Sequence, residues 1–330
     1  MAFIYGPSRT DTAIHHGLAL LTILSITTPI FLLIAFGFAA VHGGMLTRHD
    51  MRGLGGFVLN FALPALLFKA MSQRTLVEMI DLHLLLAYSL GSILVAGLGM
   101  VMICLVQKRS LRSGALVAMG MSMSNSAFIG FPIASQLIGK QAGPMLAVYA
   151  AVESMVMMPI LFTLAEVGEN GSGRWTTVIG GVLKRMLKNP LIVAIIAGLA
   201  VTASGLSMPA PLVRAVDMLS AASAPVALFC IGGTLAGLSL KEMSGDIVTI
   251  VAGKLILHPL SVFAVFFLLP FGNPALRTAA IINAGMPMLS IYPILAQKYG
   301  KEGISAAAVV LATVVSFITI NALLWLTGSG

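Results

Sequence analysis

Residues 119–140 read MGMSMSNSAFIGFPIASQLIGK, and residues 282–301 read INAGMPMLSIYPILAQKYGK. Both stretches lie within apolar runs, yet both contain prolines and small polar side chains. Proline lacks a backbone donor and clashes with the preceding helical turn, so each stretch predicts an interrupted helix. Because lipid offers no hydrogen bonds, the freed backbone groups need protein or a water-filled cavity around them. The two stretches therefore predict an internal polar site.

The two stretches belong to an internal repeat with an offset of 161 residues. Five of the nine positions in 132–140 are identical to their counterparts in 293–301. The same offset relates three further pairs of residues: Pro64 and Pro225, Pro29 and Pro190, Gly37 and Gly198. We predict that four prolines of the repeat break their helices: Pro64, Pro132, Pro225 and Pro293.

The composition is that of a membrane protein, because 58% of the 330 residues are hydrophobic and 9% are charged. Soluble domains carry about 25% charged residues. A transmembrane helix needs roughly 20 apolar residues. Ten runs come close to that length, near 18–41, 54–71, 83–106, 114–138, 142–166, 188–205, 212–238, 246–270, 275–297 and 303–327. We therefore predict an all-α integral membrane protein with ten transmembrane helices.

Each repeat holds five of these runs, so the second copy enters the membrane from the opposite side. We predict two inverted five-helix repeats, residues 1–166 and 188–330, joined by a linker over 167–187. Inverted repeats are typical of secondary transporters, since two equivalent halves give outward-open and inward-open states of similar energy. The interrupted fourth and ninth helices are expected to cross near the midplane of the bilayer.

The basic residues predict how the chain lies in the membrane. Loops after odd-numbered runs hold 12 Lys and Arg residues, whereas the termini and the other loops hold 6. By the positive-inside rule, the odd loops and the linker are cytoplasmic and both termini are extracytoplasmic. Residues 175–188 form a basic amphipathic stretch that could lie along the membrane interface. The net charge of +8 is confined to short loops, which argues against nucleic acid as a partner.

Small polar residues at the two interruptions are the candidate binding site. Half-helix termini offer free N–H groups and partial positive charge, which suits a small anion. The alternative is that glycine, serine and proline merely let the helices pack closely. The candidate substrate-binding residues are Ser124, Asn125, Ser126, Asn283, Gly285, Met286, Pro287 and Ser290.

Three ionisable residues lie inside the apolar runs: Glu153, Lys254 and His258. Such residues are candidates for coupling or charge roles. Glu153 could carry a proton or help to bind a cation, and Lys254 could attract the anion or pair with a carboxylate. Alternatively, Glu153 is structural and Lys254 snorkels to the interface. We expect no metal and no cofactor, with Na⁺ or H⁺ as the candidate coupling ion. The two cysteines have no metal-binding spacing.

The chain resembles the auxin efflux carrier family, specifically its bacterial branch of malonate- and malate-type permeases. The matching elements are NFALPALLF at 60–68, NSAFIGFP at 125–132, GKLILHP at 253–259 and MPMLSIYPILAQKYG at 286–300. The resemblance implies a dimeric scaffold of helices one, two, six and seven, and a mobile, elevator-like transport domain of the other six. Plant members have proline before the asparagine that matches Asn125. Here that residue is Ser124, which implies a less sharply kinked first interruption.

The predicted function is a secondary carrier for a small organic anion, such as malonate, malate or an auxin-like carboxylate, in the cytoplasmic membrane. A bile-acid-type symporter or a cation/proton exchanger of similar architecture is an alternative. An exchanger would need adjacent carboxylates inside the membrane, and the apolar runs offer Glu153 alone at that depth. An enzyme is disfavoured because no paired Asp, Ser/His or HExxH motif occurs within the runs. A sensor without transport activity would usually carry an added soluble domain.

Overall fold

The computed structural model describes residues 9–72, 81–170, 188–205, 208–236, 245–269, 273–297 and 299–327. Throughout this part of the chain the structure is helical, and its only β-type pairing is one isolated antiparallel bridge between Ser124 and Met288. The fold class predicted from the sequence, all-α, is therefore confirmed. The amphipathic stretch of the linker lies almost entirely outside the described residues.

The first half of the chain contains five helical groups, several of which include a wider π-helical turn. These elements are α1 (Arg9–His42), α2 (Arg48–Phe57), η1 (Val58–Ala62), α3 (Leu63–Ser72), α4 (Leu82–Met100), η3 (Val101–Val106), α5 (Leu111–Ser122), η4 (Ser126–Gly130), α6 (Phe131–Ile138), η5 (Gly139–Gln141), α7 (Ala142–Ala151), η6 (Val152–Met157) and α8 (Met158–Asn170).

The second half contains α10 (Pro190–Ser204), α11 (Ala210–Leu235), α12 (Gly245–Ala252), η7 (Gly253–Leu257), α13 (His258–Leu268), α14 (Pro274–Ala284), α15 (Tyr292–Gln297) and α16 (Glu302–Leu326). Helical residues thus occupy each of the ten apolar runs. Within the described ranges, six continuous helical stretches are long and apolar enough to cross a membrane: Arg48–Ser72, Leu82–Val106, Ser126–Gly168, Ala210–Leu235, Gly245–Leu268 and Glu302–Leu326. Two shorter apolar helices are Thr27–His42 and Pro190–Ser204.

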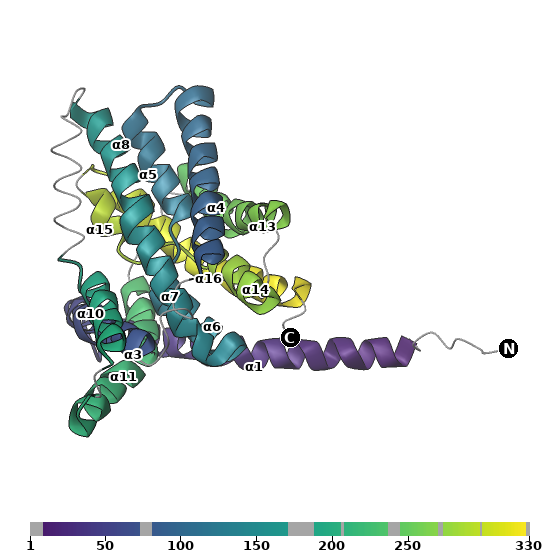
Figure 1. Cartoon of the computed structure of the whole chain (residues 1–330). Coiled ribbons are helices and arrows are strands. Elements are labelled where there is room, and N and C mark those ends of the chain that lie inside the picture. The colour runs from purple at the N-terminus through teal and green to yellow at the C-terminus, as the bar shows by residue number, and fades with distance from the viewer. Residues whose placement is uncertain are drawn as a thin grey trace.

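The helices form two groups, and each group mixes the two halves of the sequence (Figure 1). In one group α1 packs on α11 and α3 packs on α10, around a core that includes Ile34, Leu67 and Leu228. In the other group α4, α5 and α8 pack with α12, α13 and α16. The outward face of α4 exposes leucines such as Leu90 and Leu94, an arrangement suited to lipid contact.

Two close helix crossings use residues that the repeat relates to each other. A Cβ on Gly37 of α1 would lie 1.9 Å from the carbonyl oxygen of Phe229 in α11. A Cβ on Gly198 of α10 would lie 2.8 Å from the carbonyl oxygen of Phe68 in α3. The offset of 161 residues relates Gly37 to Gly198 and Phe68 to Phe229. Both crossings therefore need glycine, because a side chain would push the two backbones apart.

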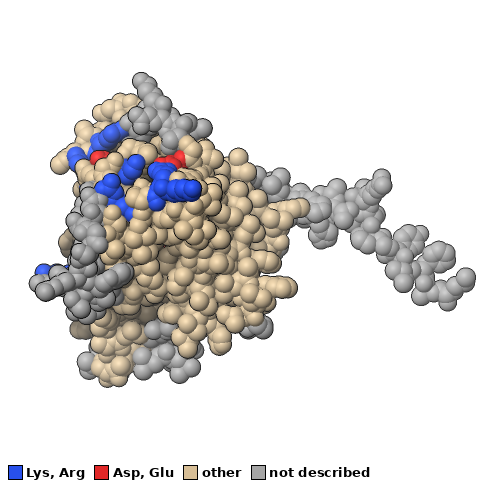
Figure 2. All heavy atoms as spheres, turned by 90° about the horizontal axis from the view of Figure 1, so that it is seen from above, with Lys and Arg blue, Asp and Glu red and all other residues tan. Residues whose placement is uncertain are grey.

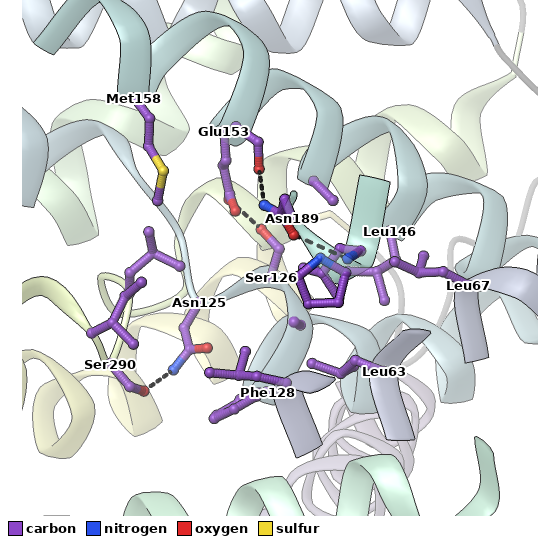
Figure 3. A pocket seen from close by; sticks show the side chains of 18 of the residues that line it. Leu63, Leu67, Asn125, Ser126, Phe128, Leu146, Glu153, Met158, Asn189 and Ser290 are labelled. Carbon is purple, nitrogen blue, oxygen red and sulfur yellow. Dashed lines mark hydrogen bonds between the residues drawn. The ribbon is translucent and has the colours of Figure 1, made fainter. Parts of the chain in front are cut away.

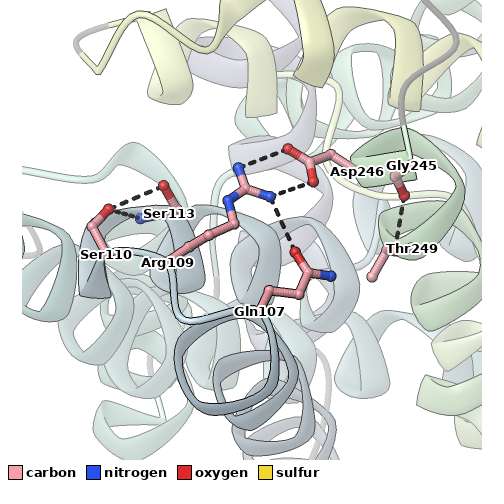
Figure 4. Close-up of polar contacts among 7 residues, drawn as sticks. All are labelled: Gln107, Arg109, Ser110, Ser113, Gly245, Asp246 and Thr249. Atoms are coloured by element: carbon pink, nitrogen blue, oxygen red, sulfur yellow. Dashed lines mark hydrogen bonds and ion pairs between the residues drawn. The ribbon is translucent and has the colours of Figure 1, made fainter.

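Hydrogen bonds and an ion pair join the first and third loops to the two ends that flank the seventh loop. Arg48 Nε donates to the carbonyl oxygen of Ala236 at 3.0 Å, which joins the first loop to the end of α11. Arg109, in the loop before α5, makes a two-pronged ion pair with Asp246 of α12 at 2.5 and 2.9 Å (Figure 4). This pair raises the pKa of Arg109, chiefly through its hydrogen bond to Asp246. Figure 2 shows Lys and Arg side chains gathered on the face seen from above.

Even-numbered loops meet one another in the same way. The Lys69 ammonium lies 2.7 Å from the Asp217 carboxylate, and Thr202 donates its hydroxyl hydrogen to the Met71 carbonyl at 2.8 Å. These contacts join the end of α3 to the start of α11 and the end of α10. The alternation agrees with the sidedness predicted from the basic residues.

The prediction that Pro64, Pro132, Pro225 and Pro293 break their helices is wrong, because each of these prolines lies within a helix. α11 runs unbroken through Pro225, and the helix Ser126–Gly168 continues through Pro132. Pro293 lies in α15, and Pro64 lies in the first turn of α3. The two real interruptions lie upstream of Pro132 and Pro293.

A π-helical turn instead precedes several prolines. The segments η1, η4, η6 and η7 each end two residues before a proline, namely Pro64, Pro132, Pro159 and Pro259. Proline offers no N–H and its ring crowds the carbonyl four residues earlier. A wider turn relieves that crowding and leaves the helix continuous.

Candidate functional site

The first interruption follows α5, whose last residue is Ser122. Met123 is extended, at φ −100° and ψ 126°, and the helix resumes at Ser126. Asn125 donates its backbone N–H to the Pro287 carbonyl at 2.8 Å. The interruption is complete even though Ser124 replaces the proline of plant relatives. Serine and asparagine side chains compete with the helical backbone for hydrogen bonds, which explains the break without proline.

The second interruption follows α14, which ends at Ala284, and the helix resumes at Tyr292. Pro287 cannot donate to a preceding carbonyl, so α14 cannot continue past it. The two unwound segments lie side by side and run antiparallel, joined by the bridge from Ser124 to Met288. Each segment therefore supplies backbone partners that the other lacks.

Lys254 joins the two unwound segments from a third helix. Its side chain is fully buried, and its Nζ donates to Ser124 Oγ at 2.9 Å and to the Ala284 carbonyl oxygen. Nζ also lies 2.8 Å from His258 Nδ1, while His258 Nε2 lies 3.0 Å from Ser92 Oγ. The Ala284 carbonyl ends α14, where the partial negative charge of the helix favours a cation.

This placement corrects one alternative from the sequence, in which Lys254 snorkels to the interface. The π-helical turn η7 directs the side chain inward, where three acceptors surround its nitrogen. An ammonium group carries three hydrogens, so the three acceptors match it. Lys254 therefore holds the unwound segments together and has no hydrogen left to donate to a ligand.

A chain of buried hydrogen bonds runs from Ser124 to Glu153. Tyr88 on α4 donates its hydroxyl hydrogen to Ser124 Oγ at 3.0 Å, and Asn283 Nδ2 donates to the Tyr88 hydroxyl at 2.9 Å. Asn283 Nδ2 also donates to Ser126 Oγ at 3.0 Å, and Ser126 donates to Glu153 Oε1 at 2.6 Å. Asn283 thus links the second interrupted helix to the first.

Gly130 leaves the space that Asn283 needs. A Cβ at position 130 would lie 2.2 Å from Asn283 Oδ1. This oxygen is buried and has no hydrogen-bond partner within the described residues. The close approach explains why glycine stands at the end of η4, the helical turn that follows the first interruption.

A cavity of about 400 Å³ opens beside this chain (Figure 3). Its polar lining includes Asn125, Ser126, Glu153 and Ser290, and Asn125 Nδ2 donates to Ser290 Oγ at 2.7 Å. The rest of the lining is mostly apolar and comes from several helices and from the second unwound segment: Leu59, Leu63, Leu67, Phe128, Leu146, Met158 and Leu289. The cavity therefore lies between the group of α1, α3, α10 and α11 and the unwound segments.

The candidate residues divide into two sets by position. Asn125, Ser126, Ser290 and Glu153 line the cavity. The other candidates do not line it in this conformation. Ser124, Asn283, Lys254 and His258 belong to the buried hydrogen-bond network, and Gly285, Met286 and Pro287 shape the second unwound segment.

Two residues of the site, Asn189 and Tyr88, were not predicted from the sequence. Asn189 lines the cavity, caps the start of α10 and donates to Ser154 Oγ at 3.5 Å. Its signal was the Asn-Pro pair, a common helix start, at a proline that the repeat had already marked. Tyr88 on α4 was also not predicted, and its signal was a tyrosine within an apolar run, which the structure shows to be buried. Across the described residues, no cluster of three or more His, Cys, Asp and Glu side chains is arranged to hold a metal ion.

Comparison with known proteins supplies the family. A family model described as "Membrane transport protein" matches residues 22–325. The chain is 26% identical over 309 residues to a putative malonate transporter of Rhizobium meliloti (strain 1021), covering 93% of this chain and 97% of the relative. It is 23% identical over 304 residues to an uncharacterized transporter of Methanothermobacter thermautotrophicus, covering 91% and 95% of the two chains.

A third relative is much longer than this chain. The lysosomal cholesterol signaling protein of Mus musculus is 26% identical over 317 residues, which cover 90% of this chain and 36% of the relative. With the family match spanning nearly the whole sequence, the resemblance to auxin efflux carriers is confirmed, and the chain belongs to the membrane transport protein family.

Proposed function

We propose that this protein is a secondary carrier that moves a small organic anion across the cytoplasmic membrane by alternating access. The cavity beside the two unwound segments is the observation that carries the proposal. Discontinuous helices at matching positions of two repeats are typical of transport sites. The cavity lies where two groups of helices meet, so sliding of one group against the other could expose it to either side of the membrane.

The ten-helix inverted repeat is part of the proposal. The glycine crossings support it, because Gly37 approaches Phe229 and Gly198 approaches Phe68 in the same manner. Residues related by the repeat thus make reciprocal contacts between α1 and α11 and between α10 and α3. Two copies related by a pseudo-two-fold axis would produce this pattern. We further propose that the α1, α3, α10 and α11 group forms the scaffold and a homodimer interface.

The cavity lining supports a small carboxylate as the substrate. Asn125, Ser126, Asn189 and Ser290 offer amide and hydroxyl groups, and leucines and Phe128 supply apolar surface. Polar groups in a mostly apolar lining suit a carboxylate with an apolar body, such as an auxin-like carboxylate. Malonate and malate are the other candidates, and a relative named a putative malonate transporter supports malonate.

Proteoliposome uptake of labelled malonate, malate and indole-3-acetate tests the proposal. We expect saturable uptake of at least one of them by the wild-type protein. Asn125→Ala removes a cavity amide and should abolish uptake while the purified protein remains monodisperse. Asn321→Ala, at a half-buried position of α16 outside the cavity where Asn321 accepts a hydrogen bond from Thr27, is the control and should retain uptake. Normal uptake by Asn125→Ala would contradict a site at the interruptions. If the wild-type protein takes up none of these three carboxylates but does take up a bile acid, a bile acid would replace them as the proposed substrate.

A further inference from the structure

The charge of the cavity is opposite to the charge that an anion carrier would need. Glu153 is the one ionisable residue among the described residues that line the cavity, and its side chain is 7% exposed. Its carboxylate accepts a hydrogen bond from Ser126, the residue next to Asn125. An entering carboxylate would therefore meet a carboxylate already in place, and like charges at a poorly hydrated site repel each other strongly.

The nearest buried cation does not reach the cavity. Lys254 is the buried cation of the described residues, and its three hydrogens match Ser124 Oγ, His258 Nδ1 and the Ala284 carbonyl. His258 faces this ammonium through Nδ1, so Nδ1 acts as an acceptor and the ring stays neutral. Lys254 can thus balance charge at a distance but cannot bind the anion directly.

The hydrogen-bond chain connects these two charges. From Lys254 it passes through Ser124, Tyr88, Asn283 and Ser126 to Glu153. Without substrate, Lys254 and an ionised Glu153 cancel to zero net charge. With a carboxylate monoanion bound, the sum is zero again only if Glu153 is protonated. An anion bound beside an ionised Glu153 would leave a net negative charge in a low-dielectric region, which is strongly disfavoured.

We propose that Glu153 must bind a proton before the anion can bind, so that the carrier moves a carboxylate monoanion together with a proton. A dicarboxylate such as malonate would then bind with its second carboxyl group protonated. This inference rests on the proposed function and names its coupling ion. The proton is taken up by the Glu153 carboxylate on the side where substrate enters and is released to water on the other side after the anion leaves. The loaded and the empty carrier are then both electrically neutral at the site, which lets each cross between the two open states.

Other titratable groups near Glu153 do not replace it. Tyr88 of α4 and Tyr149 of α7 interact with its carboxylate, as does Lys254 of η7. Tyr88 is committed to Ser124 and Asn283, and Lys254 to its three acceptors. The Tyr149 hydroxyl is buried and has no hydrogen-bond partner among the described residues. Both tyrosines are neutral in the ordinary pH range, so Glu153 is the group whose charge changes.

The first experiment uses the wild-type carrier in proteoliposomes containing a pH-sensitive dye. A proton gradient directed into the liposomes, with the acidic side outside, should drive uptake of the carboxylate that the carrier transports. One proton should enter per carboxylate charge. Uptake should not respond to an imposed potassium diffusion potential, because the moving complex is neutral. Uptake driven by a sodium gradient without proton entry would overturn the proposal while leaving the carrier function intact. Absence of uptake of every carboxylate would instead overturn the proposed function.

The second experiment compares Glu153→Gln with Glu166→Gln. Glutamine mimics the protonated side chain, so Glu153→Gln should still exchange labelled for unlabelled carboxylate across the membrane, independently of pH. It should lose net proton-driven uptake by about tenfold or more, a typical coupling strength between two bound ligands. Glu166 lies on the same helix, outside the cavity, where it accepts a hydrogen bond from Tyr299. Its variant should keep wild-type pH dependence.

Glu153→Asp keeps a titratable group and should retain proton-coupled uptake at a lower rate. Glu153→Gln with undiminished proton entry would overturn the proposal, and so would loss of exchange together with loss of uptake in a monodisperse protein. If Glu153→Gln does not fold, the ratio of protons to carboxylates in the wild-type protein decides the question by itself.

Discussion

At the scale of single residues, the site separates binding from structural support. Asn125, Ser126, Ser290 and Glu153 face the cavity, whereas Lys254 is enclosed by protein acceptors. A sequence pattern can show that a lysine lies in an apolar run, but it cannot show which way the side chain turns. Here the direction depends on η7, whose wider turn follows from the proline two residues beyond it.

Replacing Lys254 should therefore destabilise the protein. Lys254→Met keeps the length and apolar stem of the side chain but leaves His258 Nδ1 and the Ala284 carbonyl without their buried partner. Each unsatisfied buried group costs about 1–3 kcal/mol. We expect a clearly lower unfolding temperature in detergent, together with loss of uptake.

Lys69→Met is the matched control for this prediction. Lys69 pairs with Asp217, but the two side chains are 37% and 43% exposed. Such exposed ion pairs contribute about 0–1 kcal/mol, so the unfolding temperature should change little. Equal effects of the two lysine variants would contradict the supporting role of Lys254.

At the scale of helices, the π-helical turns position the functional side chains. Asn60, Ser126, Glu153 and Lys254 each lie in one of the four π-helical turns that precede a proline. An extra residue in a turn rotates the following side chains relative to an ordinary α-helix, and such turns are frequent at functional sites. These four prolines therefore shape the site without ending the helices.

Pro259→Ala tests this role of proline. Alanine restores the missing N–H and removes the ring, so η7 can relax to a regular α-helix and turn Lys254 away from Ser124. We expect reduced uptake and a lower unfolding temperature. Pro225→Ala is the control, since α11 passes through Pro225 as a regular helix, and it should retain uptake. Unchanged uptake in both variants would show that the π-helical turn is dispensable.

The sequence predicted the elements better than the details of the site. Apolar length gave the helical ranges, and the repeat marked the two interruptions, because both signals are local or periodic. The repeat could not place Glu153, Lys254 and His258 relative to one another, since they have no equivalents in the other half. Their relation through Tyr88 and Asn283 depends on packing between helices that are far apart in the chain.

At the scale of the whole molecule, the distribution of Lys and Arg among the loops predicts how the chain is oriented in the membrane. The contacts between loops agree with the predicted alternation of odd and even loops. Lys108 lies in an odd loop and His83 begins the span after an even loop, and both side chains are exposed. In a chain whose native Cys104 and Cys230 are replaced by serine, Lys108→Cys should react with an impermeant thiol reagent only from the cytoplasmic side. His83→Cys should react only from the opposite side. Labelling of both from one side would contradict the topology.

The proposed transport cycle requires the substrate to bind in the cavity between the scaffold group and the two unwound segments. Protection of Ser290→Cys from a small thiol reagent, in the same cysteine-free background, tests it most directly because Ser290 lines that cavity beside Asn125. Ser204→Cys, at the exposed end of α10, serves as the control. We predict that the transported carboxylate slows modification at position 290 in a concentration-dependent manner and leaves position 204 unaffected. Modification of Ser290→Cys at the same rate with and without a saturating substrate would contradict substrate binding in this cavity.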